Sequence, residues 1–476
     1  MKRLVAVVGF ALAVACATNP ATGRRQLILM SEAEEIQLGR QNDAEVRKTM
    51  GVYEDAALQR YVERVGRQLA QSSKRPNLPW TFTVVDEAAV NAFALPGGYI
   101  YLTRGIMPFL RDESEMAAVL GHEIGHVDAR HSAEAASNQT FAGGGLAVLG
   151  ILVPETQPFT EAASVSLGLL FLKHSRSAEL EADQLGVRYI ASNGWAPQGM
   201  PGLLNTLARL DEASGTRRGV PNWAATHPPA ADRVTRVREA VAAATSTSRA
   251  TTTNAAEFEN RLPGLVFGDS REDGFIRGSE FLHPMLRFAV RFPDGWEIIN
   301  TPEQVVATRG ESSNAAMLLE AAPANGSPEQ TARSIFGKAG FQEVRGQRQE
   351  VNGLDAYVGL YEGVSDNRRI QMQAAVIRSG SQSYLVAGLA PAGEYGSVSS
   401  AFDRAIHSFR PLSASEADRL QPDRIELYTA RSGDTWAALA RRSGGRVRPA
   451  TLAIMNGSDP AAAPRPGDRL RLVAGG

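Results

Sequence analysis

The sequence feature that most constrains this chain lies at residues 121–126, which read Gly-His-Glu-Ile-Gly-His inside a segment with helical apolar spacing. Residues four apart on a helix share one face, so His122 and His126 can converge on one metal ion. Glu123 lies about 100° around the helix, so it can face an open coordination position and act as a general base on water. A chance motif on a surface helix is the alternative, which the scarcity of histidine, seven in 476 residues, disfavours.

A third metal ligand must come from another part of the chain, since a catalytic zinc has three protein ligands and one open position. The only cysteine is Cys16, so no multi-cysteine site is available. Residues 175–186 predict an acidic helix in which Glu179 and Asp183 share one face. Glu179 can bind the metal, and Asp183 can accept the other ring proton of a ligating histidine. Alone, this segment would be interpreted as a solvated acidic face.

The two motifs together carry a family resemblance. His-Glu-x-x-His at 122–126 and Ser-Arg-x-x-Glu-x-x-Ala-Asp at 175–183 resemble the gluzincin zinc peptidases that include HtpX, the CAAX prenyl protease and BepA. The resemblance covers roughly residues 19–245. It implies an α-rich zincin domain, one Zn²⁺ per chain, and Glu179 as the zinc glutamate with Glu181 as the fallback. The multi-span membrane type does not fit, because no apolar run reaches spanning length.

Other stretches resemble the soluble bacterial lipoprotein branch of this family. Residues 91–98 resemble the segment at the active-site edge strand, which implies that Asn91 and Ala92 lie where an extended substrate pairs. Thr-His-Pro at 226–228, followed by Asp-Arg at 232–233, implies that His227 lies beside the metal. His227 then either fills the fourth coordination position or acts as a catalytic group. His131 is expected to be structural, and the role of His174 stays undecided.

The first residues predict export and a lipid anchor. Residues 1–15 have the basic start and short apolar run of a signal peptide. Ala-Val-Ala-Cys at 13–16 resembles a lipobox, which implies lipidation of Cys16, and residues 16–30 resemble the start of a mature lipoprotein. Because Ala17 is not a retention aspartate, we expect the periplasmic face of an outer membrane. The alternative is an ordinary secretory signal with a chance cysteine.

The chain is expected to be α+β, with a strand unit at 80–103, a helix at 113–136 and an acidic helix at 176–192. Two apolar halves at 141–172 predict either a buried helical hairpin or one that faces membrane or substrate. The later residues predict an α+β accessory domain and a βααβ module, because 428–436 resemble the start of a LysM module. The predicted parts are a signal peptide at 1–15, the lipoprotein segment at 16–30, a metallopeptidase domain at 31–245, a linker at 246–256, an accessory domain at 257–413 and the LysM-like module at 425–474.

These features predict a zinc endopeptidase of the bacterial envelope that degrades misfolded or stalled envelope proteins. Its expected partners are those unfolded proteins, the membrane through the lipid, and peptidoglycan if the LysM-like module binds glycan. A net charge of −1 gives no sign of a nucleic-acid partner. Two alternatives stay open: a chaperone-like assembly factor with latent protease activity, and a cell-wall peptide hydrolase that the LysM-like module directs.

Overall fold

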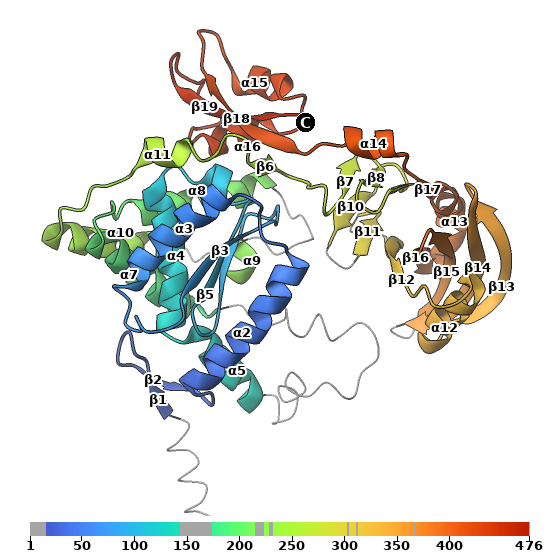
Figure 1. Cartoon of the computed structure of the whole chain (residues 1–476), viewed down its shortest axis with the longest axis horizontal. Helices are drawn as coiled ribbons and strands as arrows, with labels where there is room; N and C mark the ends of the chain where they lie inside the picture. The colour runs from blue at the N-terminus through green and yellow to red at the C-terminus, as the bar shows by residue number, and fades with distance from the viewer. Residues whose placement is uncertain are drawn as a thin grey trace, which may run out of the picture. The chain divides into compact units, whose positions relative to one another are not determined.

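The structure is a computed structural model. It describes residues 16–142, 174–214, 223–227, 232–301, 304–310, 313–365 and 368–475. These residues form two compact units, drawn in Figure 1. Unit 1 contains the described residues up to 268 together with 423–475, and unit 2 contains residues 269–422. This division differs from the predicted domains, because residues 257–268 and the C-terminal module belong to the same unit as the metal motifs.

Unit 1 opens with a hairpin, β1 (Cys16–Thr18) and β2 (Arg25–Leu27), and two helices, α2 (Glu32–Thr49) and α3 (Ala56–Ala70). A capping box at Ser31 starts α2, and Gly51, with φ of 67°, separates the two helices. The strand unit follows as β3 (Thr81–Val85), β4 (Ala92–Leu95) and β5 (Tyr99–Thr103). Their order is β3-β5-β4, so β4 is an edge strand, antiparallel to β5.

The helix that carries the histidine motif is α4 (Glu113–Asp128), which Asp112 caps and in which every residue is buried. The prediction of one helix over 113–136 was wrong at its end. Arg130 has a positive φ of 59°, and the chain restarts as α5 (His131–Ala142). The Arg130 side chain explains this break, because it donates to the carbonyl of Met30 and to Glu35, at 2.6 Å each. These tertiary contacts favour a conformation that ends the helix.

The acidic helix is α7 (Arg176–Ser192), and it packs against α4. Small residues allow the close approach, since a Cβ on Gly125 would lie 3.0 Å from the carbonyl oxygen of Ala182. The helices α8 (Gly199–Ser214), α9 (Trp223–Thr226) and α10 (Arg233–Thr247) follow. Residues 141 and 142 end α5, and the rest of the predicted apolar hairpin at 141–172 lies outside the described residues.

The last segments of unit 1 include the predicted βααβ order. They are α11 (Ala255–Glu259), β6 (Val266–Phe267), β18 (Asp423–Thr429), α15 (Trp436–Arg442), α16 (Pro449–Met455) and β19 (Arg469–Ala474). The strand order β19-β18-β6 joins the C-terminal module to residues 266–267. The predicted linker at 246–256 also packs on unit 1, because Thr253 accepts a hydrogen bond from the backbone of Glu113 and Thr252 bridges to Trp195.

Unit 2 is α+β, as predicted, and has one seven-stranded and one four-stranded sheet with three helices among its described residues. Its elements are β7 (Phe275–Arg277), β8 (Glu280–His283), β9 (Phe288–Arg291), β10 (Glu297–Asn300), β11 (Gln304–Thr308), β12 (Ala316–Ala322), α12 (Pro328–Lys338), β13 (Gln342–Val351), β14 (Leu354–Ser365), β15 (Arg368–Ser379), β16 (Gln382–Pro391), α13 (Ala392–His407), β17 (Arg410–Pro411) and α14 (Ala414–Arg419).

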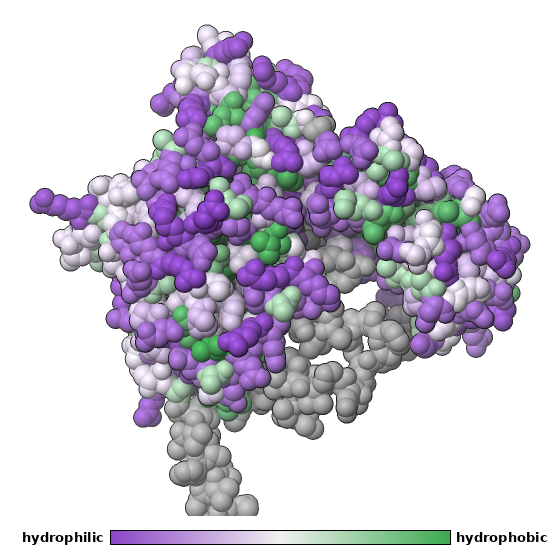
Figure 2. Space-filling model, in the orientation of Figure 1, coloured by the Kyte–Doolittle hydropathy of each residue, from purple (hydrophilic) through white to green (hydrophobic). Residues whose placement is uncertain are grey.

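The face of the described residues that Figure 2 shows is mainly hydrophilic, and the apolar residues on it form small patches. Within the described ranges, no helix is both long and apolar enough to cross a bilayer.

Candidate metal centre

Three segments of unit 1 bring four candidate ligands together. His122 and His126 project from α4, Glu179 comes from α7, and His227 follows α9. All four are buried, and one ligand atom from each lies within 4.8 Å of the other three. The Nε2 atoms of His122 and His126 are 3.0 Å apart, and His126 Nε2 lies 3.4 Å from a Glu179 oxygen. His227 Nδ1 lies 3.1 Å from that same oxygen.

These distances fit a tetrahedral metal ion. Ligand atoms at about 2.0–2.1 Å from a tetrahedral zinc lie about 3.3 Å from one another, which the separations of 3.0–3.4 Å match. The other carboxylate oxygen of Glu179, Oε2, lies 3.0 Å from Arg233 Nη1 and 3.6 Å from His122 Nε2. Imidazole and carboxylate ligands are those that zinc takes in catalytic sites. The residues present therefore fit a zinc ion.

Asp183 orients the first histidine, in the position that the sequence predicted. Its Oδ1 lies 2.9 Å from His122 Nδ1, so His122 keeps Nε2 for the cluster. Arg233 donates from Nε and Nη2 to Asp183, at 2.9 Å each, and its Nη1 lies 3.0 Å from Glu179 Oε2. Burial opposes the charged form of Asp183, but the hydrogen bonds from His122 and Arg233 lower the pKa of its carboxyl group. This contact of Arg233 with Asp183 was not predicted from the sequence.

Glu123 lies beside the cluster without joining it, which suits a general base. Its side chain is 2% exposed, and its Oε1 lies 3.5 Å from His227 Nε2 and has no hydrogen-bond partner. Burial raises the pKa of Glu123, because the charged form loses its solvation. A carboxylate whose pKa is raised toward neutrality accepts a proton more readily and later returns it.

Burial and neighbouring charges also set the protonation of the candidate ligands. Burial lowers the pKa of His126 well below its ordinary value, so its ring is neutral at pH 7. Burial opposes the charged form of Glu179, yet the charge of His227 and the hydrogen bonds of His126 and His227 hold its pKa well below the ordinary value. A neutral imidazole and an ionised carboxylate are the forms that bind metal.

Aromatic rings pack around the cluster. Trp223 stacks on His227 with ring centroids 4.1 Å apart, and His174 stacks on His126 at 4.0 Å. Burial, with a smaller contribution from His227, lowers the pKa of His174 to about 3, so its ring is neutral. His174 therefore packs against a candidate ligand.

The other predicted site residues lie apart from the four ligand atoms. Glu181, the fallback ligand, points to the N-terminal segment and is absent from the cluster of described residues. Asn91 precedes β4, its backbone exchanges hydrogen bonds with Thr103, and Ala92 is the first residue of that edge strand. Cys16 lies in β1 and pairs with Leu27.

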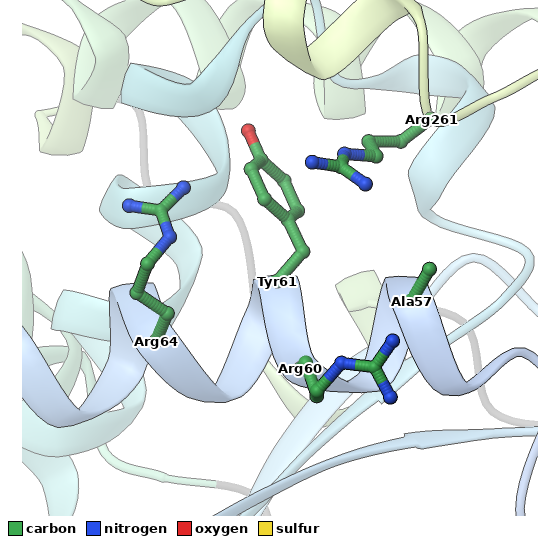
Figure 3. Close-up of a pocket in the computed structure, with 5 residues that line it drawn as sticks. All are labelled: Ala57, Arg60, Tyr61, Arg64 and Arg261. Atoms are coloured by element: carbon green, nitrogen blue, oxygen red, sulfur yellow. The ribbon is translucent and has the colours of Figure 1, made fainter.

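A separate pocket, shown in Figure 3, is lined by Ala57, Arg60, Tyr61, Arg64 and Arg261. The Tyr61 ring lies between the guanidinium groups of Arg64 and Arg261, each 5.1 Å from its centroid. Glu257 pairs with both of these arginines, at 3.3 and 3.6 Å. The pocket shares no residue with the metal cluster, and the Arg64–Glu257 pair joins α3 to α11.

Comparison with known proteins agrees with this geometry. Residues 56–241 match the model of peptidase family M48. The beta-barrel assembly-enhancing protease of Escherichia coli is 29% identical over 222 residues, which cover 44% of each chain. The mitochondrial metalloendopeptidase OMA1 of Arabidopsis thaliana is 33% identical over 37% of this chain and 35% of its own. The metalloprotease YcaL of Escherichia coli is 28% identical over 38% of this chain and 71% of its own.

The chain spans less than half the length of the first two of these relatives. The family match lies over the helices that supply the candidate ligands, and zinc is the metal that M48 peptidases use. The resemblance predicted from the two motifs is confirmed: residues 56–241 of this chain form a peptidase family M48 domain.

Proposed function

We propose that this chain is a zinc-dependent endopeptidase of the bacterial cell envelope that degrades misfolded or stalled envelope proteins. The observation that carries the proposal is the buried convergence of His122, His126 and Glu179, with Glu123 beside them. An M48 domain over the same helices supports it. Relatives named as proteases and metalloendopeptidases agree with hydrolysis of peptide bonds.

Each residue takes a role that its position allows. His122, His126 and Glu179 would hold the zinc ion, which would supply Lewis-acid polarisation of the scissile carbonyl and of the attacking water. Glu123 accepts the proton of that water and passes it to the leaving amine. Asp183 and Arg233 hold the ligands in place. Substrate pairs as an extended strand along β4, where Asn91 and Ala92 lie.

Casein is a suitable unstructured substrate for the test. Glu123→Gln should keep zinc and lose proteolysis by at least roughly 10²–10⁴-fold, because an amide does not accept the proton. Glu134→Gln, on α5 and outside the cluster, is the matched control and should retain activity. Near-normal cleavage by Glu123→Gln would reject the mechanism.

Cleavage of purified peptidoglycan but not casein would favour the cell-wall hydrolase. Full complementation of a deletion by Glu123→Gln would favour the chaperone-like factor.

The place of action is proposed from the N-terminal sequence, and a relative named as a beta-barrel assembly-enhancing protease supports it. We propose that the chain is cleaved before Cys16 and anchored through lipid on that residue at the periplasmic face of the outer membrane. Mass spectrometry of the mature N-terminus should find a lipidated Cys16. Cleavage elsewhere without lipid would reject the anchor.

His227 offers a second proposal about the same site, that the resting enzyme is latent. Its Nδ1 lies 3.3 Å from His122 Nε2 and 3.1 Å from Glu179, which suits a fourth ligand. A fourth protein ligand would displace the water on which Glu123 acts, and substrate would have to move the loop. His227→Ala should then raise casein cleavage with zinc content unchanged. A fall in cleavage with zinc retained would instead assign His227 a catalytic role.

A further inference from the structure

The second zinc-ligand candidate, His126, has an unusual partner on the side away from the cluster. Its Nδ1 lies 3.0 Å from Nδ1 of His131, the first residue of α5. Both rings are 2% exposed, and their planes are nearly perpendicular, at 73°. The break of the helix at Arg130 places His131 in this position. A continuous helix would not bring these two rings together, since positions five apart do not share a face.

The geometry fixes where the protons of both rings lie. His126 Nε2 faces the cluster, so metal binding requires its ring proton on Nδ1. A hydrogen bond between the two Nδ1 atoms then requires His131 Nδ1 to accept, which leaves the proton of His131 on Nε2. That atom is buried, lies 3.6 Å from Glu181 Oε2, and has no closer hydrogen-bond partner. His131 thus occupies the place that a carboxylate or carbonyl usually takes beside a ligating histidine.

Glu181 is held from the other side by the N-terminal segment. Asn19 Nδ2 and Thr22 Oγ1 donate to Glu181 Oε1 at 2.6 and 2.8 Å, and Arg24 Nε lies 3.8 Å from Oε2. These contacts orient Oε2 of the carboxylate toward His131.

The turn that carries these donors is preformed. Asn19 is 1% exposed, and its Oδ1 accepts from the backbone of Ala21 and Thr22, which leaves Nδ2 for Glu181. Its own backbone exchanges hydrogen bonds with Gly23 and Arg24. The strands β1 and β2 close this turn, and Gln26 of β2 donates to the carbonyl of Ala129 at the end of α4. The segment is therefore docked directly beside the helix that bears the zinc motif.

We propose that His131 and Glu181 are positioning residues of the metal centre, and that residues 19–24 complete it from outside. The chain of contacts runs from Asn19 and Thr22 to Glu181, then to His131, then to His126. It sets the tautomer and ring orientation of His126 and so strengthens zinc binding. This inference rests on the proposed zinc site, and it makes zinc affinity depend on residues that begin three positions after Cys16.

The test is zinc affinity of the full chain, measured by competition with the chelator 4-(2-pyridylazo)resorcinol. Losing a partner of a ligating histidine typically weakens metal affinity about 10–100-fold, which is the loss expected for His131→Phe. His131→Asn should recover affinity to within a few-fold, because its amide oxygen can accept the His126 proton. The double variant Asn19→Ala/Thr22→Val should fall between the wild type and His131→Phe. Arg25→Ala, an exposed residue of the same hairpin, is the matched control and should bind as the wild type does.

Two further readouts separate positioning from packing. The absorption spectrum of the Co²⁺-loaded protein should change in His131→Phe and return in His131→Asn, and the metal-free variants should melt close to the metal-free wild type. Affinity of His131→Phe within threefold of the wild type would overturn the proposal, as would equal losses in His131→Phe and His131→Asn. A wild type that binds no zinc would overturn the proposed function itself, which distinguishes the two failures.

Discussion

Replacing Arg471 with methionine should destabilise the contact between the C-terminal module and the rest of unit 1. Arg471 lies in β19 and is 5% exposed. Its guanidinium donates to the carbonyls of Pro108, Leu110 and Arg111, at 2.8, 2.6 and 3.1 Å. Burial lowers the pKa of Arg471 to about 10, so the group is still charged at pH 7.

Two opposing contributions determine how much stability Arg471→Met should lose. A hydrogen bond from a charged donor contributes about 1.5–3 kcal/mol, so the three bonds to residues 108–111 contribute about 4–9 kcal/mol. Desolvation of the guanidinium offsets part of this, by about 3 kcal/mol for its lowered pKa. Methionine removes this cost but leaves the three carbonyls without their donor. We therefore expect Arg471→Met to lose about 2–5 kcal/mol.

Native-state hydrogen exchange measured by mass spectrometry can follow the strands β18 and β19 in the full chain. A loss of 2 kcal/mol or more should speed exchange of these amides by about 30-fold or more. Arg469→Met is the matched control on the same strand, because Arg469 is 47% exposed and pairs with Glu259 on the surface. A surface pair contributes less than about 1 kcal/mol, so this variant should exchange less than about fivefold faster. Equal exchange in both variants would refute the reasoning.

Two more predictions concern helix packing and a buried histidine. Gly125→Val should lower the free energy of unfolding by about 1–3 kcal/mol and release zinc, because its Cβ would lie 3.0 Å from Ala182 of α7. Gly337→Val is the control. A Cβ at Gly337 has no atom within 4 Å, so this variant should change the melting temperature little. His283 is buried between aromatic rings, and burial lowers its pKa to about 4. As pH falls from 6.5 to 4, His283 takes up a proton in the unfolded chain but not in the folded chain. The contribution of His283 to stability therefore falls over this range. An NMR titration of ¹³C-labelled histidine, with His283→Gln to assign the signal, should give a midpoint near 4, and a midpoint near 6.5 would contradict it.

The sequence predicted those parts of the site in which local spacing decides geometry. The four-residue spacing of His122 and His126, and of Glu179 and Asp183, places each pair on one helix face, and the structure brings both faces together. The contact between His131 and His126 was missed, because it depends on a helix break at Arg130. That break follows from hydrogen bonds to residues about 100 positions earlier, which leave no local signal.

Long-range contacts and an exposed strand also leave no local signal in the sequence. The C-terminal module joins unit 1 through contacts such as those of Arg471 with residues 108–111, more than 350 positions away. Strand β13 was missed because its residues are almost all exposed and polar, so no apolar alternation marks it. Its pairing with β14 follows instead from the turn at Asn352 and Gly353, both with positive φ.

We propose that zinc is held by His122, His126 and Glu179. Elemental analysis of the purified full chain, with Glu179→Ala and Glu181→Ala beside the wild type, can test this assignment. The two glutamates are two positions apart on α7, and the structure places Glu179 in the cluster and Glu181 against the N-terminal segment. We predict one zinc per chain in the wild type, loss of zinc in Glu179→Ala, and retention in Glu181→Ala when no chelator competes. Full zinc content in Glu179→Ala, or a wild type without zinc, would contradict the account.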